Sequence, residues 1–167
     1  MLELIDTYWL YFLVGQYPDG PLGGLVLTIL LSGAALVLAM PLGLLLGVAR
    51  VSPYRSLRWP SAVLVQLVRA VPLLLVLFWV YFFLPAVTGI KTGQASTMLI
   101  VLVLFDSVYL AEIVTAGIRA LPKGQLESAR SLGLGYGAAL RLVVLPQTLK
   151  NGLPSIVSQL VSTIKAT

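Results

Sequence analysis

Three ionisable residues lie within or beside long apolar stretches of the sequence: Arg69, Asp106 and Glu112. A charged group at bilayer depth is costly, so each of these side chains should face protein, water or a partner charge. Asp106 and Glu112 are separated by six positions, about 240° round a helix, and so do not share a face. This spacing argues against two carboxylates that act together as general acid and base.

Asp106 has two open interpretations. As a pathway residue it would be the ion or proton site of a small secondary transporter or channel. As a structural residue it would be hydrogen-bonded to a neighbouring helix, which is the interpretation that we favour. Arg69 is expected either to extend its guanidinium toward the cytoplasmic surface or to pair with Glu112.

The residue types that are missing restrict the chemistry further. The 167-residue sequence contains no His and no Cys, so it lacks the commonest general base and metal ligand and any disulfide or thiolate metal site. No Gly-x-x-x-x-Gly-Lys-[Ser/Thr] phosphate-binding loop is present, and ATP chemistry must therefore come from another protein. The sequence favours a non-catalytic protein with no metal site.

The elements that position these residues are apolar helices. Apolar residues make up 59% of the sequence and charged residues only 10%, against roughly one quarter charged in a soluble domain. These values predict an all-α integral membrane protein. Gly33 and Gly43 should allow close helix approach, and Pro41 is expected to kink the first span. The expected spans cover residues 23–49, 63–87, 95–118 and, incompletely, 153–167.

The loop charges predict the orientation of these spans. Residues 1–20 contain three acids and no base, whereas the loop after the first span contains Arg50, Arg55 and Arg58. By the positive-inside rule the N-terminus and the Lys91 loop are periplasmic, and the basic stretch 119–150 is cytoplasmic. Because the net charge of +5 is spread singly over short loops, no nucleic-acid partner is expected.

The first residues have helical spacing of their own. Leu2, Ile5, Trp9 and Phe12 fall on one face of a helix. Residues 2–14 are therefore expected either to lie flat at the membrane interface or simply to lead into the first span.

Residues 124–146, which we call the bracket, have the pattern of a bent helical element. GQLESARSLG consists mainly of good helix formers, and its final Gly133 suits a left-handed stop. Gly135 and Gly137 flank Tyr136 and indicate a tight bend. A helix then resumes, and Pro146 is expected to interrupt it.

The bracket also carries apolar side chains, at Leu126, Leu132 and Leu134. A helix this short is marginal alone and needs a partner surface. The residues leave open whether that surface belongs to the same membrane domain or to another protein.

The spacing within the bracket resembles a known loop. Glu127-Ser128-Ala129, three residues, Gly133, nine residues and Val143-Val144-Leu145-Pro146 resemble the E-A-A, three residues, G, nine residues, I-x-L-P loop of binding-protein-dependent ABC importers. Ser128 replaces the middle Ala and Val143 replaces Ile.

Four further stretches resemble the polar amino acid branch of that family. Thr115 replaces the branch's usual Arg, and Ala70 and Val71 replace Gly and Thr. The four stretches are GLVLTILLS at 24–32, RAVPLLLVLFWVYFFLP at 69–85, LAEIVTAGIRALPKGQLESARSLGL at 110–134 and LPQTLKNGLPSIVSQ from residue 145.

The resemblance covers about residues 20–167 and implies the transmembrane domain of a type I ABC importer over residues 21–167. Its members have about five transmembrane helices, of which this chain would cover three and part of a fourth. It implies that 119–150 is the coupling loop to an ATPase, in which Glu127 acts locally, by capping or on the helix dipole, rather than by direct contact. The implied loop residues are Gly124, Gln125, Glu127, Ala129, Gly133, Leu134, Tyr136 and Pro146.

The resemblance further implies a permease subunit of an amino acid importer, glutamate/aspartate-like, in the bacterial inner membrane. Its partners would be a second permease subunit, identical or paralogous, two cytoplasmic ATPases and a periplasmic substrate-binding protein. ATP and Mg would be used by the ATPases, and this chain would bind no cofactor. The alternatives are the secondary transporter or channel that uses Asp106, and a membrane assembly factor or enzyme with a docking loop.

Overall fold

The computed structural model describes residues 2–89 and 93–167, and the side chains from residue 8 onward within them. This part of the chain is helical and contains no β-strand, only an isolated bridge between Gly15 and Leu22. The predicted all-α class is therefore confirmed. The Lys91 loop, predicted to be periplasmic, lies outside the described residues.

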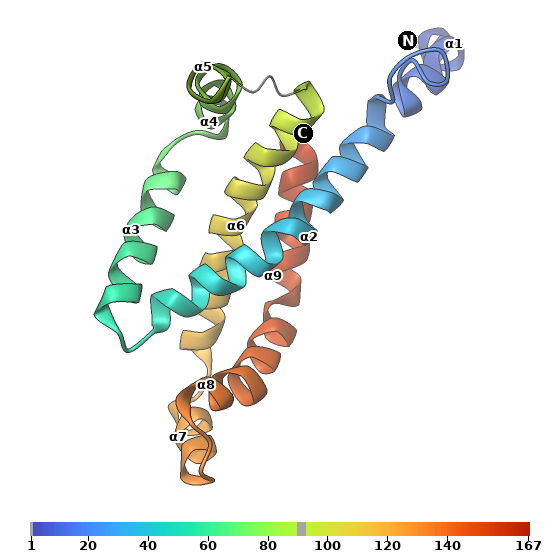
Figure 1. Ribbon diagram of the computed structural model, residues 1–167. Coiled ribbons are helices and arrows are strands. Elements are labelled where there is room, and N and C mark those ends of the chain that lie inside the picture. Colours follow the sequence, from blue (N-terminus) through green and yellow to red (C-terminus); the bar gives the residue numbers. More distant parts are fainter. Residues whose placement is uncertain (1, 90–92) are drawn as a thin grey trace.

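Two long helices form the centre of the fold (Figure 1). Helices α2 (Gly24–Val51) and α6 (Gln94–Ala120) have the length and apolar character to cross a membrane, and they match the expected spans 23–49 and 95–118 to within one residue at their starts. Helix α9 lies beside α6, and α2 crosses both. The elements are α1 Leu2–Val14, α2 Gly24–Val51, α3 Arg55–Ala70, α4 Leu73–Phe78, η1 Trp79–Phe83, α5 Leu84–Thr88, α6 Gln94–Ala120, α7 Lys123–Ser131, α8 Tyr136–Ala139, η2 Leu140–Val144 and α9 Leu145–Ala166.

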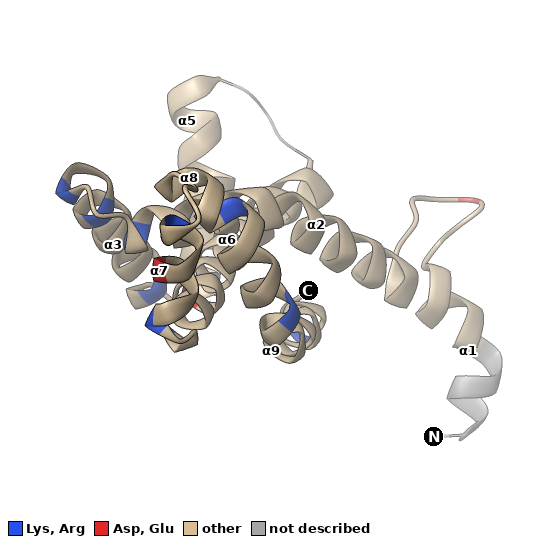
Figure 2. Cartoon of the chain, turned by 90° about the horizontal axis from the view of Figure 1, so that it is seen from below, with Lys and Arg blue, Asp and Glu red and all other residues tan. Residues whose placement is uncertain are grey.

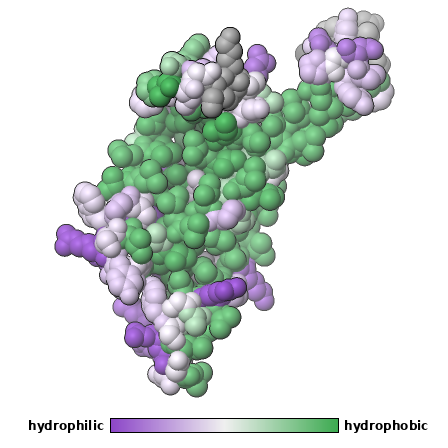
Figure 3. Space-filling model, viewed as in Figure 1, coloured by the Kyte–Doolittle hydropathy of each residue, from purple (hydrophilic) through white to green (hydrophobic). Residues whose placement is uncertain are grey.

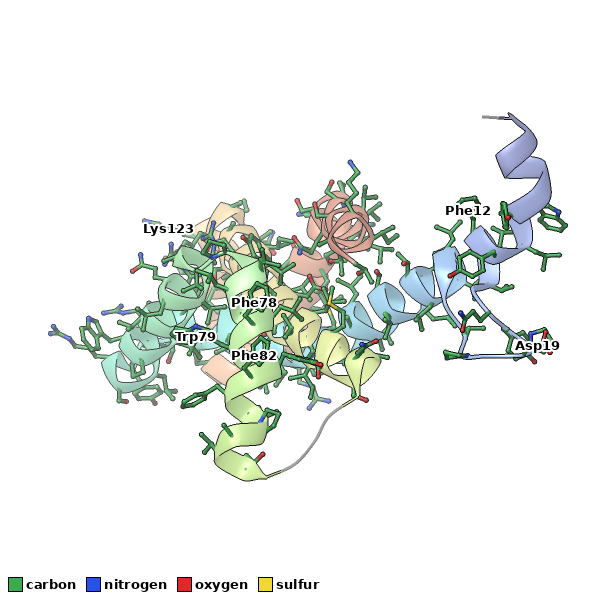
Figure 4. All side chains as sticks on the ribbon, turned by 90° about the horizontal axis from the view of Figure 1, so that it is seen from above. Phe12, Asp19, Phe78, Trp79, Phe82 and Lys123 are labelled. Carbon is green, nitrogen blue, oxygen red and sulfur yellow. The ribbon has the colours of Figure 1, made fainter. Side chains whose placement is uncertain are left out.

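The expected span 63–87 is not one straight helix. Helix α3 and the stretch Leu73–Thr88 meet at an angle of 98°. The break falls at Val71, which is extended (φ −100°, ψ 130°), because a residue before proline avoids the α conformation and Pro72 has no N–H to continue the helix. The α4–η1 segment consequently turns across the end of α3, and Figure 4 shows Phe78, Trp79 and Phe82 along it.

Pro146 does not interrupt its helix, contrary to expectation. The chain passes from α8 through the π-helical turn η2 into α9, where Pro146 occupies the first turn. The Leu145 N–H bonds to Leu140 O, five residues back, and this wider turn accommodates the proline ring and its missing N–H. The same arrangement occurs at η1, which directly precedes the α5 proline Pro85. As a result, the fourth helix begins at Leu145 and not near residue 153.

Glycine allows α2 and α6 to pack closely. A Cβ at Gly43 would lie 2.5 Å from Leu110 Cβ, and one at Gly47 would lie 2.7 Å from Val114 Cβ. The buried Thr115 hydroxyl also donates to Gly47 O at 3.3 Å. Gly43 is thus confirmed as a contact glycine, whereas no described residue approaches Gly33, where a Cβ would meet nothing within 4 Å. Helix α2 continues through Pro41.

Substituting Gly43 with Ala should destabilise the subunit by about 1–3 kcal/mol, because the added methyl overpacks the α2–α6 contact. The measurement is the midpoint of denaturation in detergent micelles. Gly33→Ala on the same helix is the matched control and should be neutral or stabilising by about 0.5–1 kcal/mol. Equal midpoints for the two variants would contradict this account of the contact.

Charge is unevenly distributed along the molecule. Figure 2 shows Lys and Arg gathered on α3, α7, α8 and α9, and Figure 4 shows Asp19 far from Lys123. Between the two ends the surface is predominantly apolar (Figure 3). We call the end with α7 and α8 the basic end.

Helix α1 has the predicted limits, and the exposed Trp9 and Phe12 fit an interfacial helix, which stays a prediction.

Candidate functional site

The bracket projects from the basic end (Figure 1), and its first limb ends in a Schellman motif. Gly133 has φ +86°, its N–H bonds to Arg130 O at 3.0 Å, and the Leu134 N–H bonds to Ala129 O at 3.2 Å. These are the two hydrogen bonds that define the motif. The predicted left-handed stop at Gly133 is therefore confirmed.

The second limb returns from Gly135 through α8 and η2 into α9, and it packs against the first. Ala129, on the first limb, is only 4% exposed. The Gln147 side-chain amide donates to Gln125 Oε1 at 3.3 Å and to Val143 O at 2.9 Å. The bracket is thereby attached to the first turn of α9.

The apolar side chains of the bracket have different surroundings. Leu132 is 84% exposed, whereas Leu126 and Tyr136 line a cavity of about 390 Å³ beneath the bracket, together with Val51 and Ile118 from α2 and α6. Burial raises the pKa of the Tyr136 phenol above its ordinary value. Leu132 is therefore the leucine that the bracket presents outward.

Glu127 does not have the expected capping role. Helix α7 begins after Pro122 without a side-chain cap and has no acid in its first turn. Glu127 lies in the middle of the helix and is exposed, and its backbone carbonyl accepts a hydrogen bond from Ser131 Oγ at 3.0 Å. Glu127 and Gln125 are exposed, and both also line the cavity beneath the bracket.

A cluster of three charges joins α2, α3 and α6. Arg50 and Arg69 contact the same oxygen, Glu112 Oε2, at 2.7 Å and 2.9 Å, and the Arg69 guanidinium lies 5.5 Å from the Tyr109 ring centroid. The predicted Arg69–Glu112 pair is confirmed. Arg50, only 9% exposed, was not predicted as a partner, because its place at the end of a span indicated only a loop charge.

Asp106 joins α6 to α9. Its Oδ1 accepts hydrogen bonds from the Gln159 amide and the Thr163 hydroxyl, both at 2.8 Å. The residue is 2% exposed, and its Oδ2 is buried without a partner among the described residues. These two hydrogen bonds are those that the structural interpretation of Asp106 expects, and its role stays a prediction; its contacts do not overlap those of Glu112. Within the described residues, no group of three or more His, Cys or acidic side chains is arranged for a metal.

Substituting Asp106 with Leu should destabilise the subunit by about 1–2 kcal/mol, since the Gln159 amide loses its acceptor. Asp106→Asn is the matched control, because its side-chain oxygen still accepts both hydrogen bonds. Detergent denaturation of the two variants measures the difference. A leucine variant as stable as the asparagine variant would show that these hydrogen bonds do not stabilise the α6–α9 contact.

Comparison with protein families and structures shows consistent similarity. A family model described as "Binding-protein-dependent transport system inner membrane component" matches residues 39–167. The probable glutamine ABC transporter permease protein GlnP of Bacillus subtilis is 38% identical over 86% of this chain and 66% of its own length. The inner membrane amino-acid ABC transporter permease protein YhdY of Escherichia coli is 36% identical over 96% of this chain and 46% of its own.

Two solved structures share the fold. The crystal structure of an amino acid ABC transporter with histidines aligns with a TM-score of 0.74 at 29% identity, over 84% of this chain and 65% of that one. The MetNI methionine ABC transporter aligns with a TM-score of 0.68 at 22% identity, over 84% of this chain and 66% of that one. The chain thus spans about half to two thirds of the length of the curated relatives named above.

Proposed function

The chain belongs to the family of binding-protein-dependent transport system inner membrane components, and from this premise we propose that it is the permease subunit of an ATP-driven amino acid importer. The observation that carries the proposal is the bracket at the basic end. It is short, is stopped by a Schellman motif and is fixed to α9 through Gln147 and Gln125. A motion of a protein docked on the bracket would therefore be transmitted directly to a long helix of the membrane domain.

The bracket residues divide into two proposed roles. The surface proposed to contact the ATPase consists of four exposed residues: Gly124, Gln125, Glu127 and Leu132. The shape of that surface depends on residues that set the backbone or pack the limbs together: Ala129, Gly133, Leu134, Tyr136 and Pro146.

The chain is proposed to work within a larger assembly. A second permease subunit, identical or paralogous, completes the translocation path across the membrane. Two cytoplasmic ATPases use ATP and Mg²⁺. A periplasmic substrate-binding protein delivers the cargo. Transport then follows a population shift between inward-open and outward-open states, driven by ATP binding and hydrolysis on the partner subunits. This subunit itself carries out no catalysis.

The proposed cargo is a polar amino acid. Relatives named for the transport of glutamine, of arginine and of glutamate, glutamine, aspartate and asparagine support this class. Specificity is proposed to reside mainly in the binding protein, as the ionisable residues Asp106, Arg69 and Glu112 all bond within the chain.

The test is uptake by proteoliposomes that contain this subunit in its full complex with the ATPase and the binding protein. A panel of labelled polar amino acids is supplied with ATP, with no ATP, or with an ion gradient alone. We expect accumulation only with ATP. Uptake driven by the ion gradient without ATP would contradict the proposal and support a secondary transporter.

We propose the bacterial inner membrane as the location, with a periplasmic N-terminus and the bracket in the cytoplasm. The basic end then faces the cytoplasm, as the positive-inside rule requires. A topology reporter fused after Lys123 should be active in the cytoplasm and one fused after Lys91 in the periplasm. The reverse pattern would contradict this orientation.

A further inference from the structure

A hollow lined by apolar side chains lies between α2, α3 and α6, and we call it the apolar hollow. Its volume is about 630 Å³, within the range of about 300–1,000 Å³ that is usual for sites that bind small molecules. Helix α2 contributes Leu45, α3 contributes Leu64 and Leu67, and α6 contributes Leu104. The 98° bend after α3 carries the α4–η1 segment across one end of this space, where Trp79 lines it.

The apolar hollow lies at membrane depth. Leu104 and Val108, which line it, fall in the middle of α6, and both α2 and α6 are able to cross the membrane. Of the described residues that line it, only Ser107 and Trp79 have a polar side-chain atom, and the Ser107 hydroxyl donates to Leu104 O at 2.8 Å. Buried water needs about two to four polar partners, so this space favours hydrocarbon over water.

The start of α3 carries side chains that are typical of a membrane interface. Tyr54 and Trp59 are each 66% exposed, and aromatic side chains of this kind lie at the level of the lipid headgroups. Arg55 and Arg58 lie between them in the sequence and are exposed, and their side chains form no ion pair or hydrogen bond with a described residue. Figure 2 shows these basic residues on α3. Two unpaired cations at headgroup depth attract an anionic lipid.

The basic start of α3 and the apolar hollow are one lipid length apart. Arg55 precedes Leu64 by nine residues, about 14 Å along the helix axis, and half of the hydrocarbon core is about 15 Å thick. The exposed Leu57 lies seven residues before Leu64, about two turns, so it is on the same face of α3. An apolar face therefore leads from the two arginines to the hollow.

We propose that an anionic phospholipid binds at this place, with its phosphate at Arg55 and Arg58 and one acyl chain in the apolar hollow. The acyl chain packs against the exposed leucines of α2, α3 and α6 beside the bend and supports α3 where it diverges from the α4–η1 segment. A zwitterionic lipid brings a cation toward the same arginines and binds more weakly. The inference depends on the membrane location of the chain and not on the proposed transport function.

Photo-crosslinking in a bilayer tests this site. The subunit, together with the subunits that co-purify with it, is reconstituted into phosphatidylcholine vesicles with a small share of phosphatidylglycerol that carries a diazirine on one acyl chain. Phosphatidylcholine with the same photoreactive chain is the comparison lipid. Crosslinked residues are identified by peptide mass spectrometry. We expect the anionic lipid to label the residues of the apolar hollow roughly tenfold more than the comparison lipid does.

One pair of variants tests the headgroup contact. Arg55→Gln combined with Arg58→Gln should reduce labelling by phosphatidylglycerol to the level of phosphatidylcholine. Arg141→Gln combined with Lys150→Gln is the matched control, because it removes two exposed charges elsewhere at the basic end. This control should keep the preference for the anionic lipid.

A second pair of variants tests the chain contact. Leu45→Trp places a larger side chain in the apolar hollow and should lower labelling of the hollow by both lipids severalfold. Leu38→Trp is the matched control, since Leu38 is an exposed leucine of the same helix that does not line the hollow. Labelling of the hollow in this control should equal that of the unmodified protein.

Three results would overturn the inference. Equal labelling of the hollow by the two lipids would show that no anionic headgroup is recognised. A preference for phosphatidylglycerol that survives the loss of Arg55 and Arg58 would place the headgroup elsewhere. A hollow that stays unlabelled while Leu38 and other exposed leucines of α2 are labelled would show that protein, and not lipid, covers it.

Discussion

Replacing Glu112 with alanine is expected to lower the stability of the folded subunit by about 2–3 kcal/mol, because the buried Arg50 guanidinium loses its carboxylate partner, while the 35% exposure of the Glu112 side chain keeps the cost below that of a fully buried pair. The Arg50 side chain is only 10% exposed and its Nη1 lies 2.7 Å from Glu112 Oε2, while its buried Nε has no hydrogen-bond partner among the described residues. The loss would appear as a lower denaturation midpoint in detergent and as less protein in the membrane.

Arg69 provides the control for this prediction. It contacts the same oxygen, but its side chain is 41% exposed, so Arg69→Ala should cost less than about 1 kcal/mol. In double-mutant cycles the Arg50–Glu112 pair should show the larger coupling, and Arg50→Leu with Glu112→Leu should restore part of the stability. Equal effects of Arg69→Ala and Glu112→Ala would show that burial of Arg50 does not determine the cost.

Replacing Gly133 with valine should reduce ATP-driven uptake at least roughly tenfold while leaving the subunit in the membrane. Gly133 has φ +86°, a conformation that costs an L-residue about 1–2 kcal/mol and a β-branched residue more. A Cβ at this position meets nothing within 4 Å, so the effect comes from the backbone and not from a clash. The altered stop would change the surface that the bracket presents to the ATPase.

Gly135 is the matched control for Gly133. It lies in the same bend with equally open space, but its φ is −63°, which any residue adopts. Gly135→Ala should therefore retain uptake and co-purification of the ATPase, whereas Gly133→Val should lose both. Normal ATPase retention and transport in the Gly133 variant would reject the coupling role of the bracket.

The bracket was predictable because its shape depends on neighbouring residues. Gly133 and the good helix formers before it determine the stop at the end of α7 locally, through two hydrogen bonds within six residues. The prediction that Pro146 interrupts the helix was wrong because a proline can begin a helical segment as well as end one. The wide turn η2 permits this arrangement, and it has no clear signal in the sequence.

Features that depend on long-range packing were only partly predictable. The Arg69–Glu112 pair followed from the need of buried charges for partners, but the Arg50 contact depends on how α2 crosses α6. Likewise, Gln159 and Thr163 could be matched to Asp106 only after α9 was placed beside α6. Pro72 indicated the bend at Val71. The uniform hydropathy of residues 63–87 nevertheless favoured one continuous span, and the bend was missed.

The wide turn Leu140–Val144 determines in which direction the side chains of α9 point relative to the bracket. A π turn holds one residue more than an α turn, and each helical residue advances the direction of its side chain by about 100°. Deleting one residue from this turn would leave a continuous helix whose exposed polar face, with Ser155 and Ser158, points in a different direction. The orientation of the face with Ser155 and Ser158 relative to the bracket is therefore determined by the turn that connects the bracket to α9. That turn is remote from the face itself.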